Sequence, residues 1–222
     1  MVRRPGKGVT QMNAEAGNAA YLGDIPSMVA FLPGLSSEER TDIQDVLLDA
    51  QLFAGRQFDF KTQWNSWMHY YRSRLKARGI QQRGLVLGDS LVVSNVDDLL
   101  QATFNVSNPA DRERVGSLVQ RAVKAMGVNQ AAESYFQNGF DHGRLGSFQV
   151  VPCEKYEHDR ILLLLCSLHL SVDERAAGSR RLLFHFKGGS YTFDSKRYAT
   201  HRDDVMRYLD GRAQGLVRAA LI

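Results

Sequence analysis

The chain has 222 residues, of which 44% are hydrophobic and 23% are charged. A folded globular domain has this composition, whereas disordered, collagen-like and coiled-coil chains do not. The net charge of +4 is small and spread along the sequence. It would help binding to an anionic partner, but it does not indicate a dedicated nucleic-acid site.

The sequence contains no predicted membrane span. Its longest purely apolar run, residues 161–166, is far shorter than the about 20 residues that a spanning helix needs. No apolar stretch follows the first basic residues, so no secretory signal peptide is evident. Two cysteines, Cys153 and Cys166, are too few for a disulfide scaffold. We therefore expect a soluble cytoplasmic protein, although signal-independent export or assembly into a particle would leave the same pattern.

Residues 1–22 are rich in glycine, alanine and basic residues and lack apolar periodicity. Such a segment cannot build a core, so we predict an arm outside a single α+β domain of residues 23–222. An arm of this kind becomes ordered only where its own domain or a neighbouring subunit holds it. Its basic residues, Arg3, Arg4 and Lys7, are therefore candidate interface residues.

Two helices are predicted after the arm. An aspartate cap and Pro26 in the first turn indicate a short helix over residues 24–32. Ser36 and Glu39 have the spacing of a capping box, and apolar residues then recur at helical spacing up to Gly55. Both helices are expected to pack on the same core.

A third helix is predicted over residues 60–78, with an aromatic stripe and Gly79 as its end. Its last turns are basic, which complements the negative end of the helix dipole. Tyrosines beside these basic residues would also suit contact with phosphates and bases, so nucleic-acid binding is kept as an alternative function. The basic residues are Arg72, Arg74, Lys76 and Arg78.

Two short strands, residues 84–87 and 91–93, are predicted on either side of a tight turn. Caps and periodicity then indicate three helices, over residues 96–104, 109–126 and 129–137. The front part of the chain is thus predicted to be mainly helical.

From about residue 148 the apolar pattern changes to the alternation typical of strands. We predict strands over residues 148–153, 160–172, 181–187 and 191–193, the second and third forming a hairpin, and helices after residue 200. The predicted fold class is α+β. A helix-rich N-terminal portion packs on an antiparallel β-sheet formed mainly by the C-terminal portion, and C-terminal helices close it.

The long predicted strand is apolar on both faces in its first half. Alternation puts Leu164 and Cys166 on the face expected to be core. The opposite face also begins with three apolar residues, and either the chain's own helices or another molecule must cover them. We call these residues, Ile161, Leu163 and Leu165, the apolar patch.

The most site-like segment is the glycine-rich stretch around Asp141, His142 and Arg144. A loop between a helix and a strand can hold such side chains with their tips free, as catalytic groups require. A small hydrolase-type enzyme that uses these three residues is therefore an alternative function. A plain flexible connector would have the same composition.

The other histidines and cysteines lack a catalytic or metal-binding spacing. His169 and His185 are predicted to approach each other across the hairpin, which supplies two metal ligands without a third. Cys166 is expected in the core and His169 in solvent, so they do not form a nucleophile and base. Cys153 is expected to be more exposed. We predict no metal and no cofactor.

The leading hypothesis is a non-enzymatic interaction or self-assembly protein. It would form homo-oligomers, or join other protein subunits in a larger complex, through the arm and the apolar patch. Its motivation is a strand that is apolar on both faces in a chain without a catalytic constellation. Nucleic acid is an allowed partner but not the favoured one.

Overall fold

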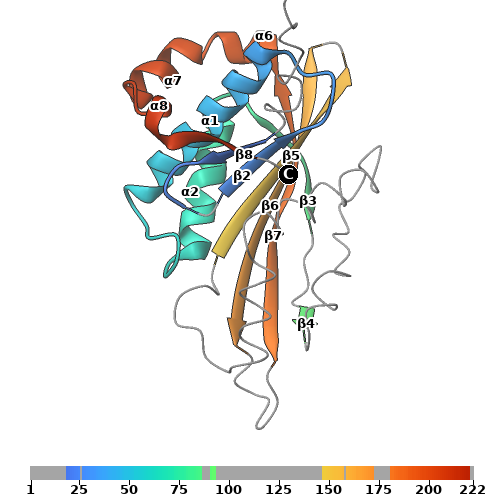
Figure 1. The fold of residues 1–222 in the computed structure, drawn as a ribbon, viewed down its shortest axis with the longest axis vertical. Coiled ribbons are helices and arrows are strands. Elements are labelled where there is room, and N and C mark those ends of the chain that lie inside the picture. Colours follow the sequence, from blue (N-terminus) through green and yellow to red (C-terminus); the bar gives the residue numbers. More distant parts are fainter. Residues whose placement is uncertain are drawn as a thin grey trace, which may run out of the picture.

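The computed structural model describes residues 19–25, 27–86, 91–93, 147–157, 159–172 and 181–220. Eight strands and five helices lie in these ranges (Figure 1). In chain order they are β1 (Ala19–Leu22), β2 (Ser27–Phe31), α1 (Ser37–Gly55), α2 (Trp64–Ala77), β3 (Gln81–Val86), β4 (Leu91–Val93), β5 (Ser147–Glu157), β6 (Arg160–Val172), β7 (Leu182–Asp194), α6 (Ser195–Ala199), α7 (Arg202–Leu209), α8 (Ala213–Leu216) and β8 (Val217–Ala220).

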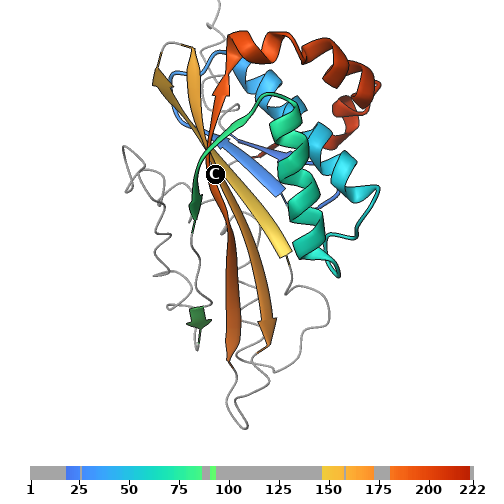
Figure 2. The ribbon, with the colours of Figure 1, turned by 180° about the vertical axis from the view of Figure 1, so that it is seen from behind.

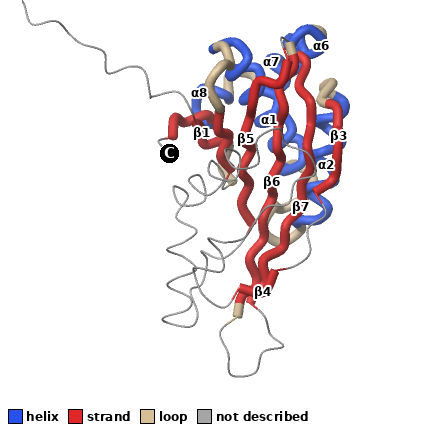
Figure 3. Tube along the Cα trace, turned by 90° about the vertical axis from the view of Figure 1, so that its right-hand side faces the viewer, coloured by secondary structure: helices blue, strands red, loops and turns tan. Residues whose placement is uncertain are grey.

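The described strands form one sheet in the order β3-β7-β6-β5-β2-β1-β8, and β4 also pairs with β7. Only the β2–β5 pair among them is parallel. The helices lie on one side of this sheet, and the far ends of β6 and β7 run beyond them (Figures 1 and 3). The predicted α+β fold class, with helices packed on a mostly antiparallel sheet, is therefore confirmed.

The core lies between the sheet and the two long helices. Buried side chains of β2, β5 and β6 meet buried side chains of α1 and α2 in a single cluster. Within it, Trp67 and Tyr71 stack with their ring centroids 4.9 Å apart, and Phe60 meets Trp67 edge-on at 4.7 Å. Burying an aromatic side chain of this size contributes about 1.5–3 kcal/mol to stability, so α2 is fixed on the sheet by its aromatic stripe.

The predicted capping box starts α1. The Ser36 hydroxyl accepts from the Glu39 amide at 3.2 Å, and the Glu39 carboxylate accepts from the Ser36 amide at 2.9 Å. The predicted end at Gly55 is also confirmed. Helix α2 begins at Trp64, four residues later than predicted, because the Asp59 carboxylate accepts from the amides of Lys61 and Thr62 and holds a turn there.

The helix predicted over residues 24–32 is wrong, because this segment contains strand β2. All five residues of β2 are buried, and the strand is paired on both sides, by β1 and by β5. Burial on both faces and two sets of backbone hydrogen bonds outweigh the local start signal of Pro26. The last four residues of the predicted arm likewise form β1, so the sheet begins at Ala19.

Strand β7 is continuous where two separate strands were predicted. Its pairing with β6 runs from Leu182 to Asp194 and confirms the predicted hairpin. Gly188 and Gly189 do not interrupt it, because they permit close approach of the neighbouring strands. A Cβ on Gly188 would lie 1.8 Å from the Leu165 carbonyl oxygen, and one on Gly189 would lie 2.4 Å from that of Gly84.

Strands β3 and β4 do not pair with each other as the predicted tight turn implied. Both run antiparallel to β7, β3 beside residues 188–192 and β4 beside residues 182–184, so they follow one another along the same edge. The helices predicted over residues 96–104, 109–126 and 129–137 lie outside the described residues.

The chain returns to helix after β7, as predicted, but its last described segment is a strand. Helix α6 begins at a cap in which the Asp194 carboxylate accepts from the Arg197 amide at 2.9 Å, and α7 and α8 follow. Strand β8 then pairs antiparallel with β1 (Figure 2). None of the described helices is long and apolar enough to cross a membrane.

Candidate functional site

The basic end of α2 is divided between two sides of the helix. Arg74 and Arg78, one turn apart, both face the buried carboxylate of Asp49 on α1. The Arg74 guanidinium donates to its two oxygens at 2.7 and 2.9 Å, and Arg78 reaches them at 3.4 Å. Arg72 and Lys76 point elsewhere and line a cavity. Two of the four residues predicted for nucleic-acid binding therefore hold α2 to α1.

The cavity has a volume of about 630 Å³, and we call it the basic cavity. It is formed by α2, by the first residues of β3, by β7 and by α6. Its lining residues are His69, Arg72, Ser73, Lys76, Ile80, Gln81, Gln82, Tyr191 and Arg197.

A helix cap brings these elements together. At the end of α2 the Gly79 amide donates to the Lys76 carbonyl and the Ile80 amide donates to the Leu75 carbonyl, both at 3.1 Å, which is the Schellman arrangement. Gly79 has a φ of +84°, which a side chain would strain, and a Cβ there would lie 3.2 Å from His201. The cap turns the chain from α2 directly into β3, so the basic side chains lie beside Gln81.

The charge in the basic cavity is one-sided. Arg72, Lys76 and Arg197 are cationic, and none of the lining residues that the structure describes carries a carboxylate. No ion pair joins the three cations to a carboxylate within the described part of the chain. Burial raises the pKa of Tyr191, and the nearby Arg72 guanidinium offsets part of that rise. The arrangement suits a ligand with several anionic oxygens.

Sequence reasoning identified Arg72 and Lys76 as part of a basic helix end, but it missed Tyr191 and Arg197. Both lie more than a hundred residues further along the chain, and no local motif marks them. The pairing of β3 with β7 brings them to α2, with Gln82 opposite Tyr191.

A second charged cluster lies on α1, where three buried aspartates follow the helical repeat. Arg202 donates to both oxygens of Asp42 at 2.9 and 2.6 Å, and Arg74 does the same for Asp49. Asp45 lies between them, and its own pKa is raised to about 6 by burial and by the negative charge of Asp42. This cluster joins α1 to α2 and α7.

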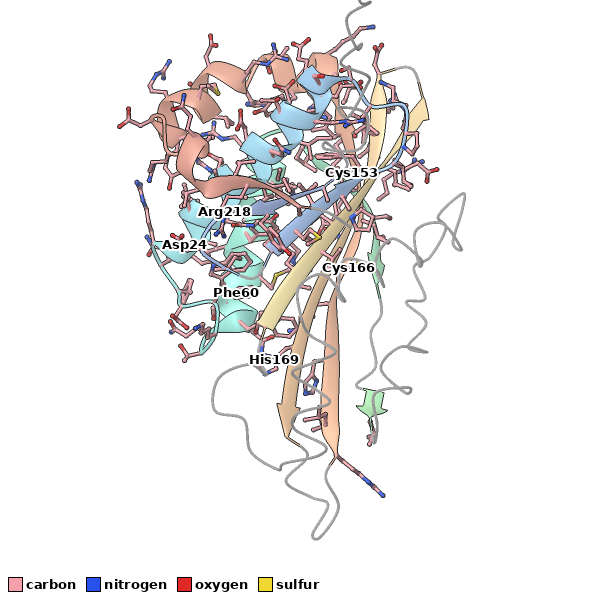
Figure 4. All side chains as sticks on the ribbon, in the orientation of Figure 1. Asp24, Phe60, Cys153, Cys166, His169 and Arg218 are labelled. Carbon is pink, nitrogen blue, oxygen red and sulfur yellow. The ribbon has the colours of Figure 1, made fainter. Side chains whose placement is uncertain are left out.

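The two predicted histidines do meet across the hairpin. His169 is opposite His185, with ring centroids 6.1 Å apart, and its Nδ1 lies 2.8 Å from the Ser147 hydroxyl. The Trp64 ring stacks on it at 5.5 Å (Figure 4). His169 is half-buried rather than in solvent as predicted, and this burial, together with the nearby His185, lowers its pKa. No group of three potential metal ligands occurs within the described ranges.

Both cysteines are buried free thiols on strands of the sheet (Figure 4). Cys166 is buried as predicted, but the predicted faces of β6 are reversed, because Ile161, Leu163 and Leu165, not Cys166, belong to the cluster that packs on the helices. The expected exposure of Cys153 is wrong, because β5 is a central strand and carries Cys153 into the core. Burial raises the pKa of each thiol well above its ordinary value. Neither therefore forms a thiolate nucleophile readily.

The apolar patch lies inside the protein. Ile161, Leu163 and Leu165 are at most 2% exposed and belong to the cluster that packs against α1 and α2. The chain's own helices, one of the two covers considered from the sequence, therefore cover them. The other candidate residues, Arg3, Arg4, Lys7, Asp141, His142 and Arg144, lie outside the described residues.

No protein-family model matches this sequence, and no curated protein matches it. A solved structure of a delta-endotoxin is similar to this chain over 87% of this chain and 89% of its own, at 13% sequence identity and a TM-score of 0.42. A likeness of this degree concerns the course of the backbone and carries no conclusion about activity.

Proposed function

We propose that this chain is a non-enzymatic interaction protein that binds a small anionic ligand in the basic cavity. The observation that carries the proposal is the concentration of Arg72, Lys76 and Arg197 around one cavity, with no carboxylate among its described lining residues. Guanidinium and ammonium groups that are not neutralised by neighbouring acids attract anionic oxygens and bind them through charge-assisted hydrogen bonds.

The size of the basic cavity favours a small molecule over an extended polymer. Its volume of about 630 Å³ falls within the range of about 300–1,000 Å³ that is typical of small-molecule sites. A nucleic-acid surface would need a longer basic stripe, and Arg74 and Arg78 are engaged with Asp49 instead. This proposal differs from the protein assembly expected from the sequence, since the apolar patch is buried and Arg3, Arg4 and Lys7 lie outside the described residues.

Titration calorimetry with pyrophosphate tests the proposal. Pyrophosphate is a small polyanion, and its affinity should fall as salt is added, because the attraction is electrostatic. We expect Arg72→Gln and Lys76→Gln each to weaken binding about tenfold, since a hydrogen bond to a charged group contributes about 1.5–3 kcal/mol.

Arg218→Gln is the matched control. Arg218 is an exposed arginine on β8, away from the basic cavity (Figure 4), and its substitution removes the same unit of net charge. It should change the affinity less than about twofold. The proposal is wrong if wild-type protein shows no binding at millimolar pyrophosphate, or if the control weakens binding as much as the cavity variants do.

A further inference from the structure

A second cavity, of about 440 Å³, lies beside the end of α1, the segment after β1 and the turn before α2. Asp24 and Phe60, both labelled in Figure 4, belong to its walls. We call it the aromatic cavity. Its lining residues are Gly23, Asp24, Ile25, Gln51, Leu52, Gly55, Arg56, Phe58, Asp59, Phe60, Lys61, Trp67 and Arg212.

The lining of the aromatic cavity is mainly apolar and nearly balanced in charge. Phe58, Phe60 and Trp67 contribute aromatic rings, and Ile25 and Leu52 add aliphatic surface. Three basic and two acidic side chains also line it. In contrast to the basic cavity, it therefore has no large excess of one charge, which favours a neutral ligand.

One polar side chain in this lining is almost completely buried. Gln51 of α1 is 5% exposed, and its amide nitrogen donates to the Ser27 hydroxyl at 2.9 Å. The Ser27 hydroxyl donates to Oε1 of Gln149 at 3.2 Å, and the Gln149 amide nitrogen donates to the Ser167 hydroxyl at 3.1 Å. This relay crosses β2, β5 and β6 and holds the nitrogen of Gln51 against the sheet.

The amide oxygen of Gln51 is directed away from that relay. It is buried and has no hydrogen-bond partner in the described part of the chain. It lies beside Gly23, which also lines the aromatic cavity, and a Cβ on Gly23 would come within 2.5 Å of it. Gly23 has a φ of +69°, so glycine is favoured there, and the absence of a side chain leaves room for the oxygen at the wall of the cavity.

An acceptor that is buried without a partner costs about 1–3 kcal/mol. A ligand that donates a hydrogen bond to Gln51 would recover this free energy, whereas an equally apolar ligand without a donor would not. The aromatic side chains suit a planar ring, and Phe58, the least buried of the three, offers it the most accessible ring to pack against.

We propose that the aromatic cavity binds a neutral aromatic ligand that carries a hydroxyl or amine donor, with the donor on Oε1 of Gln51. This site is separate from the basic cavity, since the two lining sets share no residue. Its test therefore stands or fails independently of pyrophosphate binding.

Phenol and anisole are the probes, measured by calorimetry on the full chain. Both have one ring and one oxygen, but only phenol can donate a hydrogen bond. Phenol should bind at least about tenfold more tightly than anisole, because only phenol satisfies the buried acceptor. Equal affinities for the wild-type protein would overturn the proposal.

Two variants distinguish the contribution of the ligand's ring to binding from that of its hydrogen-bond donor. A Cβ at Gly55 would make only ordinary contact with Trp67, at 4.0 Å, so Gly55→Leu should place a side chain in the cavity without strain and abolish binding of both probes. Gln51→Met removes the acceptor and should make the two affinities equal. Gln57→Met, in the exposed turn after α1, is the matched control and should leave both affinities unchanged.

Binding of phenol that survives Gly55→Leu would place the probe elsewhere and overturn the proposal. A phenol preference that survives Gln51→Met would do the same. Thermal melting of each variant shows whether it is folded. If Gln51→Met fails to fold because Ser27 loses its donor, the proposal is still tested by the affinities of phenol and anisole for the wild-type protein and for Gly55→Leu.

Discussion

Among the three buried aspartates of α1, Asp45 differs from its neighbours. Asp42 and Asp49 each accept two hydrogen bonds from an arginine, whereas no hydrogen bond or ion pair to Asp45 occurs in the described part of the structure. Burial and the charge of Asp42 raise the pKa of Asp45 from 3.8 to about 6. A carboxyl group with a raised pKa in the folded state is destabilising once it ionises.

The stability of the protein should therefore depend on pH through Asp45. Between about pH 4 and pH 6 the folded state holds this proton and the unfolded state has lost it, so this contribution to stability falls as the pH rises. Asp45→Asn removes the effect. We expect the variant to be more stable than wild type by on the order of 2 kcal/mol at pH 7.5, and nearly equal to it at pH 4, in urea unfolding.

Asp42→Asn is the contrasting variant, because it removes the negative charge and one of the two oxygens that accept from Arg202. It should lower the free energy of unfolding at pH 7.5 by about 1–3 kcal/mol. A stabilisation by Asp45→Asn that is the same at pH 4 and at pH 7.5 would contradict the assigned role of its ionisation.

The hairpin of β6 and β7 is the longest pairing of the described sheet, and Gly188 sets its spacing. The Leu165 carbonyl oxygen would lie 1.8 Å from a Cβ at this position. Gly188→Ala should therefore force β6 and β7 apart and lower the free energy of unfolding by more than about 4 kcal/mol, as measured by urea unfolding. Gly215→Ala is the control. It has no atom within 4 Å, and alanine in α8 should be neutral or slightly stabilising.

Elements defined by local contacts could be predicted from the sequence. The capping box that starts α1 spans four residues, and the alternation in β6 and β7 is visible because the strands are long and adjacent. Strands β2 and β8 could not be predicted in this way. Each is short, and each has partners at the other end of the chain, so the signal that decides its conformation is not local.

The candidate site shows the same division. The basic helix end that contains Arg72 and Lys76 can be recognised in the sequence. Only the packing of α1 on α2 reveals that Arg74 donates hydrogen bonds to Asp49. In the sequence, nothing distinguishes Gln51 from any other polar residue of an amphipathic helix. Its amide oxygen lacks a hydrogen-bond partner because the relay on three strands engages the amide nitrogen and Gly23 has no side chain to offer. No spacing along the sequence indicates this arrangement.

At the scale of the whole molecule, β1 joins two parts of the sheet. It pairs with β2 on one side and with β8 on the other, and Ala20 and Leu22 are buried. A chain that starts at Gly23 should therefore be less stable than one that starts at Ala19 by at least about 3 kcal/mol. Thermal unfolding of the two truncated proteins measures this difference, and equal melting temperatures would contradict it.

The chain that starts at Ala19 also tests whether residues 1–18 take part in self-association. Loss of oligomers on removal of residues 1–22 could reflect damage to the sheet, because that deletion includes β1. Light scattering on the full chain and on the chain that starts at Ala19 isolates residues 1–18. If the oligomer of the full chain contains more subunits than that of the chain starting at Ala19, the result supports the expected role of the arm in self-association. An identical number of subunits would contradict that role.

The pairing of β1 with β8 also has a consequence for synthesis on the ribosome. The apolar strands β1 and β2 are translated first, but they pair with β8 and β5, which are translated much later. At about 5–20 residues per second, the remaining chain takes on the order of 10–40 s to emerge. During that interval β1 and β2 have only each other as partners, so the edges that later pair with β8 and β5 stay open and available to chaperones that bind extended apolar segments.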